Sequence, residues 1–188
     1  MGSSCSKGCN SSCIPKCITS ELIDTDFEKT IRYENYFKDK ILLALVVSIY
    51  DGDTFRASVK INNELVIINI RCIGYDSPEM KPPLDQARRD LEMRKALDAK
   101  NVFEKHLIRR SNHTIDRFIY IKIKGFDKYG RFLSEVYKPN YYITESYCGC
   151  YIKDNIKEIP DDCIFMNEWM VKNGYGKPYD GGKKESHV

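Results

Sequence analysis

The feature that most constrains the fold is the stretch 51–79, which reads DGDTFRASVKINNELVIINIRCIGYDSPE. It holds two runs rich in Val, Ile, Phe and Ala, at 54–61 and 65–73. Between them lies Asn62-Asn63, a pair that is typical of a tight turn. The pattern therefore predicts a β-hairpin, and the ends of such a hairpin return close to each other.

Acidic residues gather at both ends of this predicted hairpin. Asp51 and Asp53 precede its first strand, whereas Arg71 closes the second and is followed by Asp76 and Glu79. Carboxylates and an arginine that meet where strands end can hold a hard cation and a phosphate. Acid-rich segments of this kind are also ordinary turn sequences, so the residues alone leave both interpretations open. In either case we expect Asp53 and Asp76 to share one site.

The rest of the folded part predicts three more strands and a long helix. Residues 41–50 are nearly continuously apolar and predict a buried first strand. Alternating patterns predict strands at 118–126 and 132–137, joined by a turn at 127–131. A helix is expected between the third and fourth strands, from residue 87 or 90 to 107. Its basic residues suit a solvated face better than a phosphate-binding surface.

Five strands with one helix between the third and fourth predict a β-barrel with helices, of the α+β class and the five-stranded OB type. Residues 108–116 are expected to be a polar linker, and 139–162 an irregular insertion. A short helix is expected at 163–173. Cys148, Cys150 and Cys163 could bind a metal, but loop thiols more often have no specific role.

Length and composition favour one domain of 41–180, with a connector at 21–40 and a frayed end at 181–188. The net charge of +3 is only mildly basic, so it permits an acidic polymer as substrate without arguing for one. No run approaches eighteen apolar residues, which predicts no membrane-spanning helix. Without a secretory signal, the cysteines are expected to be reduced.

Residues 1–20 are small, polar and rich in cysteine, which indicates a disordered tail. The start MGSSCS matches the N-myristoylation pattern, with Gly2 exposed after removal of the methionine. The cysteines that follow are candidate palmitoylation sites, and a second acyl chain makes anchoring stable. These sites are Cys5, Cys9, Cys13 and Cys17. The alternatives are an inert tail or a metal site.

Three motifs occur in order, each beside a predicted strand: DGDT, then R-x4-DSPE, then DKYGR. Together they resemble the staphylococcal nuclease (thermonuclease) family over about residues 42–179. The resemblance implies an OB fold and Ca²⁺-dependent cleavage of single-stranded or unpaired DNA and RNA toward 3′-phosphate products. Acylated, cysteine-rich starts also occur among eukaryotic calcium-dependent nucleases of this kind.

The resemblance also implies a role for each residue that matches a motif. Asp53 and Asp76 are implied calcium ligands, together with the carbonyl of Ser77. Glu79 is the implied general base, and Arg71 and Arg131 are the implied phosphate-binding catalytic residues. The implied supporting residues are Asp51, behind the metal ligands, and Lys128 and Tyr129, beside the bound nucleotide. Two departures are a longer insertion at 139–162 and the absence of a further C-terminal helix.

The sequence therefore predicts a monomeric, Ca²⁺-dependent nuclease that is held at the cytoplasmic face of a membrane by its acylated N-terminus. Its expected partners are single-stranded DNA and RNA, with no obligate protein partner. The alternative is a non-catalytic OB module that binds nucleic acid on a membrane anchor, because such barrels often bind single strands without cutting them. A pure binder does not need clustered acids that face a polyanion, which favours the nuclease.

Overall fold

The computed structural model describes residues 32–83, 88–111, 114–143 and 156–182. The chain forms two compact units, Met1–Tyr36 and Phe37–Val188, and α2 (Tyr33–Phe37) ends in the second. The second unit begins four residues before the domain start expected at 41, because the ring of Phe37 packs edge-on against Phe126 and Phe132.

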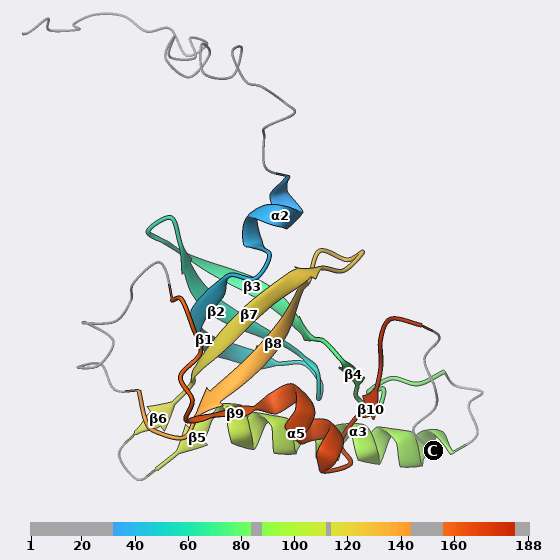
Figure 1. The fold of residues 1–188 in the computed structure, drawn as a ribbon. Helices are drawn as coiled ribbons and strands as arrows, with labels where there is room; N and C mark the ends of the chain where they lie inside the picture. Colours follow the sequence, from blue (N-terminus) through green and yellow to red (C-terminus); the bar gives the residue numbers. More distant parts are fainter. Residues whose placement is uncertain (1–31, 84–87, 112–113, 144–155, 183–188) are drawn as a thin grey trace, which may run out of the picture. The chain divides into compact units, whose positions relative to one another are not determined.

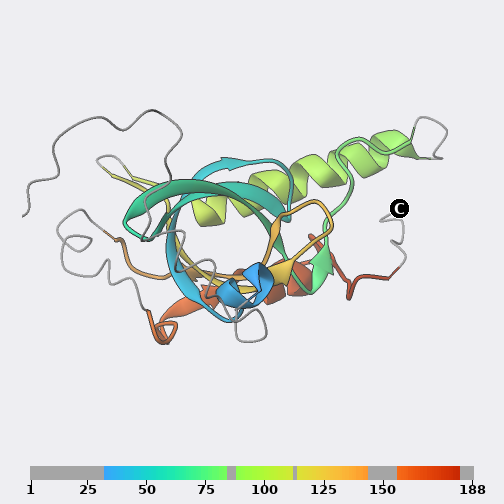
Figure 2. The same ribbon diagram turned by 90° about the horizontal axis from the view of Figure 1, so that it is seen from above.

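Five strands form a closed barrel: β1 (Ile41–Ile49), β2 (Thr54–Ile61), β3 (Glu64–Cys72), β7 (Phe118–Phe126) and β8 (Phe132–Pro139). Antiparallel pairing gives the order β3-β2-β1-β7-β8, and a parallel pairing of β3 with β8 closes the ring. Figure 2 looks into this ring. The predicted five-stranded barrel with helices is therefore confirmed.

The β2–β3 hairpin has the turn that its sequence predicts. Ile61 pairs with Glu64, and the two residues between them, Asn62 and Asn63, have φ of 50° and 68°. Two successive positive φ values define the turn type whose twist matches that of the strands, and asparagine tolerates this conformation. The turn sets the register of the whole hairpin, so that Thr54 pairs with Arg71 at its far end.

The barrel buries one face of each strand and leaves the other outside. On β1 the side chains of Ala44 and Val46 are buried, whereas Leu45 and Val47 are exposed. The expectation of a buried first strand therefore holds for one face of β1 only, because a barrel wall has only one inner face. The long helix α3 (Arg89–Leu107) packs its apolar face, including Phe103, on the barrel.

The segments outside the barrel differ from the prediction in two places. The helix expected at 163–173 is wrong in its first three residues, which form β9 (Cys163–Phe165) on the edge of β8 before α5 (Met166–Lys172) begins. The linker expected at 108–116 contains a small hairpin, β5 (Arg109–Arg110) with β6 (Ile115–Asp116). The first difference comes from long-range contacts, such as the stacking of Phe165 on Tyr137, whereas the second is a local pairing.

A third pairing positions the loop after the hairpin. β4 (Tyr75–Asp76) pairs with β10 (Lys177–Pro178), which follows α5. Figure 1 shows α3 and α5 at the same end of the barrel, beside β4 and β10. Among the helices in the described ranges, none has the length and apolar character needed to span a bilayer.

Candidate functional site

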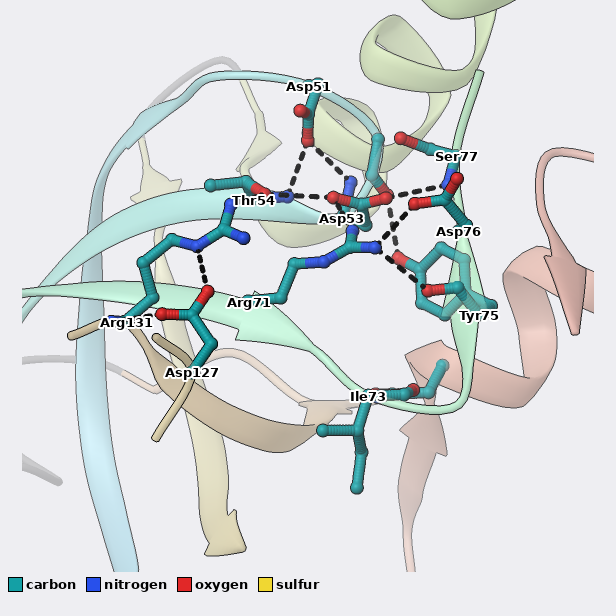
Figure 3. Close-up of polar contacts among 12 residues, drawn as sticks. Asp51, Asp53, Thr54, Arg71, Ile73, Tyr75, Asp76, Ser77, Asp127 and Arg131 are labelled. Atoms are coloured by element: carbon teal, nitrogen blue, oxygen red, sulfur yellow. Dashed lines mark hydrogen bonds and ion pairs between the residues drawn. The ribbon is translucent and has the colours of Figure 1, made fainter. Parts of the chain in front are cut away.

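The centre of the site is a buried ion cluster in which Arg71, at the end of β3, lies between Asp53 and Asp76 (Figure 3). Arg71 Nη2 lies 2.6 Å from Asp76 Oδ1, and Nη1 pairs with Asp53 Oδ1. The three residues are only 7%, 3% and 5% exposed, respectively. The structure thus brings the two aspartates together, as the hairpin geometry predicts.

The turn that carries Asp53 is held by the acid before it. Asp51 Oδ1 accepts the backbone N–H groups of Asp53, at 3.0 Å, and of Thr54, at 2.7 Å. Gly52 lies between Asp51 and Asp53 in the chain. A Cβ on Gly52 would lie 2.9 Å from Cβ of Ser77 and 3.0 Å from Cβ of Ala99. Only glycine fits this close approach without a shift of its neighbours. Asp51 therefore stabilises the turn that carries Asp53.

The loop after Arg71 is tied to the same turn. The Ser77 N–H donates to Asp53 Oδ2 at 2.6 Å, and the Tyr75 hydroxyl donates to the Gly52 carbonyl at 2.7 Å. Burial raises the pKa of Tyr75 well above its ordinary value and raises the pKa of Cys72 to about 12. Both groups are therefore neutral at physiological pH and add no charge next to the ion cluster.

Arg131 comes to the site from the turn between β7 and β8. Its Nε lies 2.6 Å from Asp127 Oδ2, and its Nη1 donates to Thr54 Oγ1 at 3.3 Å. The Thr54 hydroxyl also donates to Asp53 Oδ1, at 2.9 Å, so that one side chain touches both arginine regions (Figure 3). The side chain of Arg131 is about one-third exposed, and Arg71 is buried.

The same turn positions Lys128 and Tyr129 at the surface. Asp127 Oδ1 accepts the N–H groups of Tyr129 and Arg131, both at 2.9 Å. Burial pushes the pKa of Asp127 up, but these N–H groups and the Arg131 guanidinium outweigh it and hold the pKa below its usual value. Tyr129 is 73% exposed, and its ring lies 5.0 Å from Lys128 Nζ.

Glu79 is the predicted site residue that the structure keeps apart from the ion cluster. Its side chain is exposed, and Oε1 accepts the N–H of Lys81 at 3.2 Å. Its own N–H donates to Oε1 of the buried Glu92 at 3.0 Å. In the described part of the chain, these hydrogen bonds connect Glu79 to its loop and to α3, and not to either aspartate.

Three residues that the sequence did not single out position this loop. They are Tyr75, Glu92 and Asn167. Asn167 Nδ2 donates to the Ile73 carbonyl at 2.8 Å, and Asn167 Oδ1 accepts the N–H of Val136 at 2.8 Å. Its position one residue after the buried Met166, on an otherwise apolar helix face, was a signal. Glu92 likewise falls on the buried face of α3, four residues before Ala96.

Two pockets open on either side of the site. The Arg71 pocket has a volume of about 600 Å³ and the Arg131 pocket one of about 400 Å³. The Arg71 pocket includes Tyr75, Leu133 and Tyr179 in its wall. The Arg131 pocket is lined by residues of β1, β2 and β3 together with Tyr50 and Arg131.

The donor set of the ion cluster fits a calcium ion in chemical type. No group of three or more His, Cys, Asp or Glu side chains suited to a metal is found among the described residues, so side chains alone would supply two ligands. The carboxylates of Asp53 and Asp76 converge on one guanidinium, and Ca²⁺ completes its shell with backbone carbonyls and water. The motif resemblance implies the Ser77 carbonyl as one such ligand.

Several predicted residues lie outside the described residues. They are Gly2, Cys5, Cys9, Cys13, Cys17, Cys148 and Cys150. Cys163, which was considered with the last two as a metal site, is half-buried on β9, and burial raises the pKa of its thiol to about 11. A comparison of the chain with protein-family models and with curated proteins found no match. Any functional conclusion therefore depends on the chemistry of the site and on the motifs that form it.

Proposed function

We propose that this protein is a Ca²⁺-dependent nuclease that hydrolyses phosphodiester bonds in single-stranded or unpaired DNA and RNA toward 3′-phosphate products. The observation that carries the proposal is the Asp53–Arg71–Asp76 cluster, with Arg131 joined to it through Thr54. The barrel would be of the OB type, and the chain a member of the staphylococcal nuclease family that its motifs resemble.

Charge supports a cation in this site. By formal charge, the two aspartates and Arg71 together carry one net negative charge, which repels a phosphodiester. A divalent cation held by Asp53 and Asp76 would make the cluster net positive. The sign of the local field would then favour binding of the substrate phosphate. A bound Ca²⁺ supplies Lewis-acid activation and stabilises the charge that develops on the phosphoryl oxygens.

The two arginines are proposed to hold the phosphate. Both are planar guanidinium groups that can donate two parallel hydrogen bonds to phosphate oxygens. Burial restricts the side chain of Arg71, and the ion pair with Asp127 restricts the side chain of Arg131. Because Thr54 contacts the groups around both of them, the arginines are positioned before substrate arrives, which is what stabilisation of transition-state charge requires.

Glu79 is proposed as the general base that takes a proton from the attacking water. For this role its carboxylate must turn from the Lys81 N–H toward the phosphate. Such contacts are often incomplete in a free enzyme and tighten when substrate binds. The Arg71 pocket, with its Tyr179 and Leu133 walls, is suited to a base of the nucleotide attached to the cleaved phosphate.

A second candidate function is a non-catalytic module that binds single strands. The placement of Glu79 away from the aspartates favours it, because a binder needs no general base. Both candidates use the arginines and the pockets, and they differ in whether the chain cuts what it binds.

The test is incubation of denatured DNA and of RNA with the protein in Ca²⁺, in Mg²⁺ and in chelator. We expect cleavage in Ca²⁺, loss of cleavage in chelator, and products whose 3′-phosphate groups are removed by a phosphatase. Glu79→Gln should keep strand binding and lose about 10²- to 10⁴-fold in kcat. The matched control is Glu64→Gln, an exposed glutamate at the hairpin tip. Binding without cleavage in any cation would establish the non-catalytic module instead.

The N-terminal motif extends the proposal to the location of the protein. We expect Gly2 to be myristoylated and Cys5 and Cys9 to be palmitoylated, which would tether the nuclease to the cytoplasmic face of a membrane. Gly2→Ala should release the protein from membranes and leave cleavage unchanged. Fractionation after labelling with a myristate analogue tests this, and an unlabelled, fully soluble wild type would contradict it.

A further inference from the structure

The Arg131 pocket shares no lining residue with the Arg71 pocket, and the proposed mechanism uses only Arg131 and Thr54 of its lining. Its volume is about 400 Å³. The described residues that line it include two arginines, Arg56 and Arg131, and no carboxylate. It is therefore a concave surface whose lining residues carry a formal excess of positive charge, and it includes one of the two proposed phosphate-binding arginines.

A row of polar side chains crosses the floor of this pocket. Ser48 on β1 pairs with Arg56 on β2, which pairs with Asn69 on β3. Arg56 Nε donates to Ser48 Oγ at 3.0 Å, which fixes the direction of the guanidinium along the row. Arg56 and Asn69 are both exposed. A guanidinium beside an amide offers donors for a phosphate and both donor and acceptor for a sugar or a base edge.

An aromatic ring stands at the end of this row. Tyr50 follows β1 and is 57% exposed, although it lies in the wall of the pocket. Its backbone is fixed, because its N–H donates to the Thr54 carbonyl at 2.9 Å. Single-stranded nucleic acid is bound by grooves that combine basic residues with aromatic rings on which bases stack. The Arg131 pocket has both components in one place.

The two pockets share walls with the two arginines of the site. Arg71 lines one pocket and Arg131 lines the other. Thr54 lies between the arginine regions, since its hydroxyl contacts both Asp53 and Arg131 (Figure 3). A strand with one base in each pocket would therefore carry its intervening phosphate past both guanidinium groups.

From this arrangement we infer that the Arg131 pocket binds the nucleotide on the opposite side of the cleaved phosphate from the nucleotide in the Arg71 pocket. The inference rests on the proposed nuclease function and adds a second subsite to it. Tyr50 stacks on the base, Arg56 contacts the next phosphate of the strand, and Asn69 contacts the sugar or the base edge. The substrate is thus a strand that spans both pockets rather than a single nucleotide.

Binding of a phosphorothioate-linked oligothymidylate, which carries the charge of DNA and resists cleavage, tests the subsite. Fluorescence anisotropy in Ca²⁺ gives the Kd of each variant. Tyr50→Ala should weaken binding about five-fold or more, and Tyr50→Phe should bind as the wild type does, because the stacking ring is retained. Arg56→Gln should weaken binding and reduce the slope of log Kd against log salt by about 0.7, the value for one phosphate contact on a single strand.

Lys60→Gln is the matched control, because it removes one positive charge from the outer face of the same strand, beyond the lining of the pocket. Its Kd and salt slope should equal those of the wild type. Tyr50→Ala and Arg56→Gln variants that bind like the wild type would overturn the subsite, as would an equal loss of binding in Lys60→Gln.

A cleavage assay run in parallel separates the two proposals. If the variants bind as predicted but the wild type does not cleave, the subsite is supported and the nuclease function is excluded. If the wild type cleaves but the variants do not bind as predicted, the nuclease function is supported and the subsite is excluded. A wild type that binds no strand would overturn both.

Discussion

Two buried ion clusters in this molecule have opposite compositions. In the acidic cluster, Arg71 lies between two aspartates, whereas in the basic cluster one aspartate lies between two cations. In the basic cluster, Asp116 Oδ2 is 2.8 Å from Lys138 Nζ and 2.6 Å from Arg109 Nη2. Both clusters lie in the same compact unit, so the comparison between them concerns the ratio of acidic to basic side chains.

The basic cluster is closed by the backbone around it. Lys138 Nζ also donates to the Phe118 carbonyl at 3.0 Å, and Arg109 donates to the carbonyl of Tyr141. Asp116 Oδ1 accepts the N–H of Phe118 at 3.1 Å. Burial lowers the pKa of Lys138, although Asp116 acts in the opposite direction. These contacts tie the β5–β6 hairpin to the barrel, which is a structural task.

The acidic cluster borders a pocket through Arg71 and carries an excess of negative charge. The basic cluster also borders a pocket, through Arg109, but its excess charge is positive and each of its two cations donates to a backbone carbonyl. A divalent cation could meet the excess negative charge of the acidic cluster. We therefore propose that buried ion pairs serve folding in the basic cluster and binding in the acidic cluster. The predictions below separate the two tasks.

The largest effect is expected from breaking the closed cluster. Asp116→Ala leaves the buried Lys138 without its counter-ion and should cost about 3–5 kcal/mol of unfolding free energy. Cleavage per folded molecule should not change. Urea denaturation measures the loss, and Asp39→Ala, which removes the exposed partner of Lys124, is the control with little effect. A denaturation midpoint equal to that of the wild type would show that the basic cluster does not hold the fold.

Arg71→Ala should have its effect on rate. Loss of a preorganised charge stabiliser lowers kcat by about 10²- to 10³-fold, or about 2.7–4 kcal/mol. Because the variant frees Asp53 and Asp76 from their competing cation, we expect it to bind Ca²⁺ at least as tightly as the wild type. Calorimetric titration and steady-state kinetics measure the two quantities. If Ca²⁺ binding were lost together with activity, Arg71 would be a part of the cation site and not a phosphate ligand.

A smaller effect on the unfolding free energy is expected from Tyr75, which lies beside the acidic cluster. Tyr75→Phe removes the donor to the Gly52 carbonyl and leaves that buried carbonyl unpaired, at a cost of about 1–3 kcal/mol. Thermal unfolding measures it. Tyr137→Phe, whose hydroxyl contacts Glu135 at 3.1 Å on a less buried part of β8, is the comparison. Equal stabilities of the two variants would mean that the Tyr75 hydroxyl does not anchor the turn of Asp53.

The smallest effect concerns acid. The pKa of Asp127 is lower in the folded protein than its ordinary value of 3.8. Its ionised form therefore stabilises the folded state above that value, and the contribution disappears as the pH falls through the lower, folded pKa. The difference in unfolding free energy between the wild type and Asp127→Asn should be present at pH 6 and should shrink below about pH 4. A difference that is the same at both pH values would contradict this.

The sequence predicted the acidic cluster better than the basic one for a physical reason. Asp53 and Asp76 are brought together by one hairpin, whose turn and strand pattern are local. Lys138 and Asp116 lie on different sheets, and no single hairpin links them. Asn167 reaches the Ile73 carbonyl across 94 residues. Contacts of this kind depend on how finished elements pack, and they also moved the start of α5.

Side-chain direction was the other limit of prediction. The motifs correctly brought Arg71 to the aspartates, but the sequence could not indicate that both of its Nη groups pair with carboxylates. Nor could it indicate that the Glu79 carboxylate accepts the N–H of Lys81 instead of facing the cluster. Several acceptors compete for each charged group in so small a space, and the outcome depends on burial, which the motifs do not encode.

The central claim is that the acidic cluster is completed by a divalent cation. The most direct test is thermal unfolding of the wild type and of Asp76→Ala and Asp116→Ala in Ca²⁺ and in chelator, at equal ionic strength. A ligand at about 100 times its Kd stabilises the folded state by about 2.7 kcal/mol. The account predicts a rise in Tm with Ca²⁺ for the wild type and, from a lower starting Tm, for Asp116→Ala, but none for Asp76→Ala. An equal rise in Asp76→Ala, or no rise in the wild type, would contradict it.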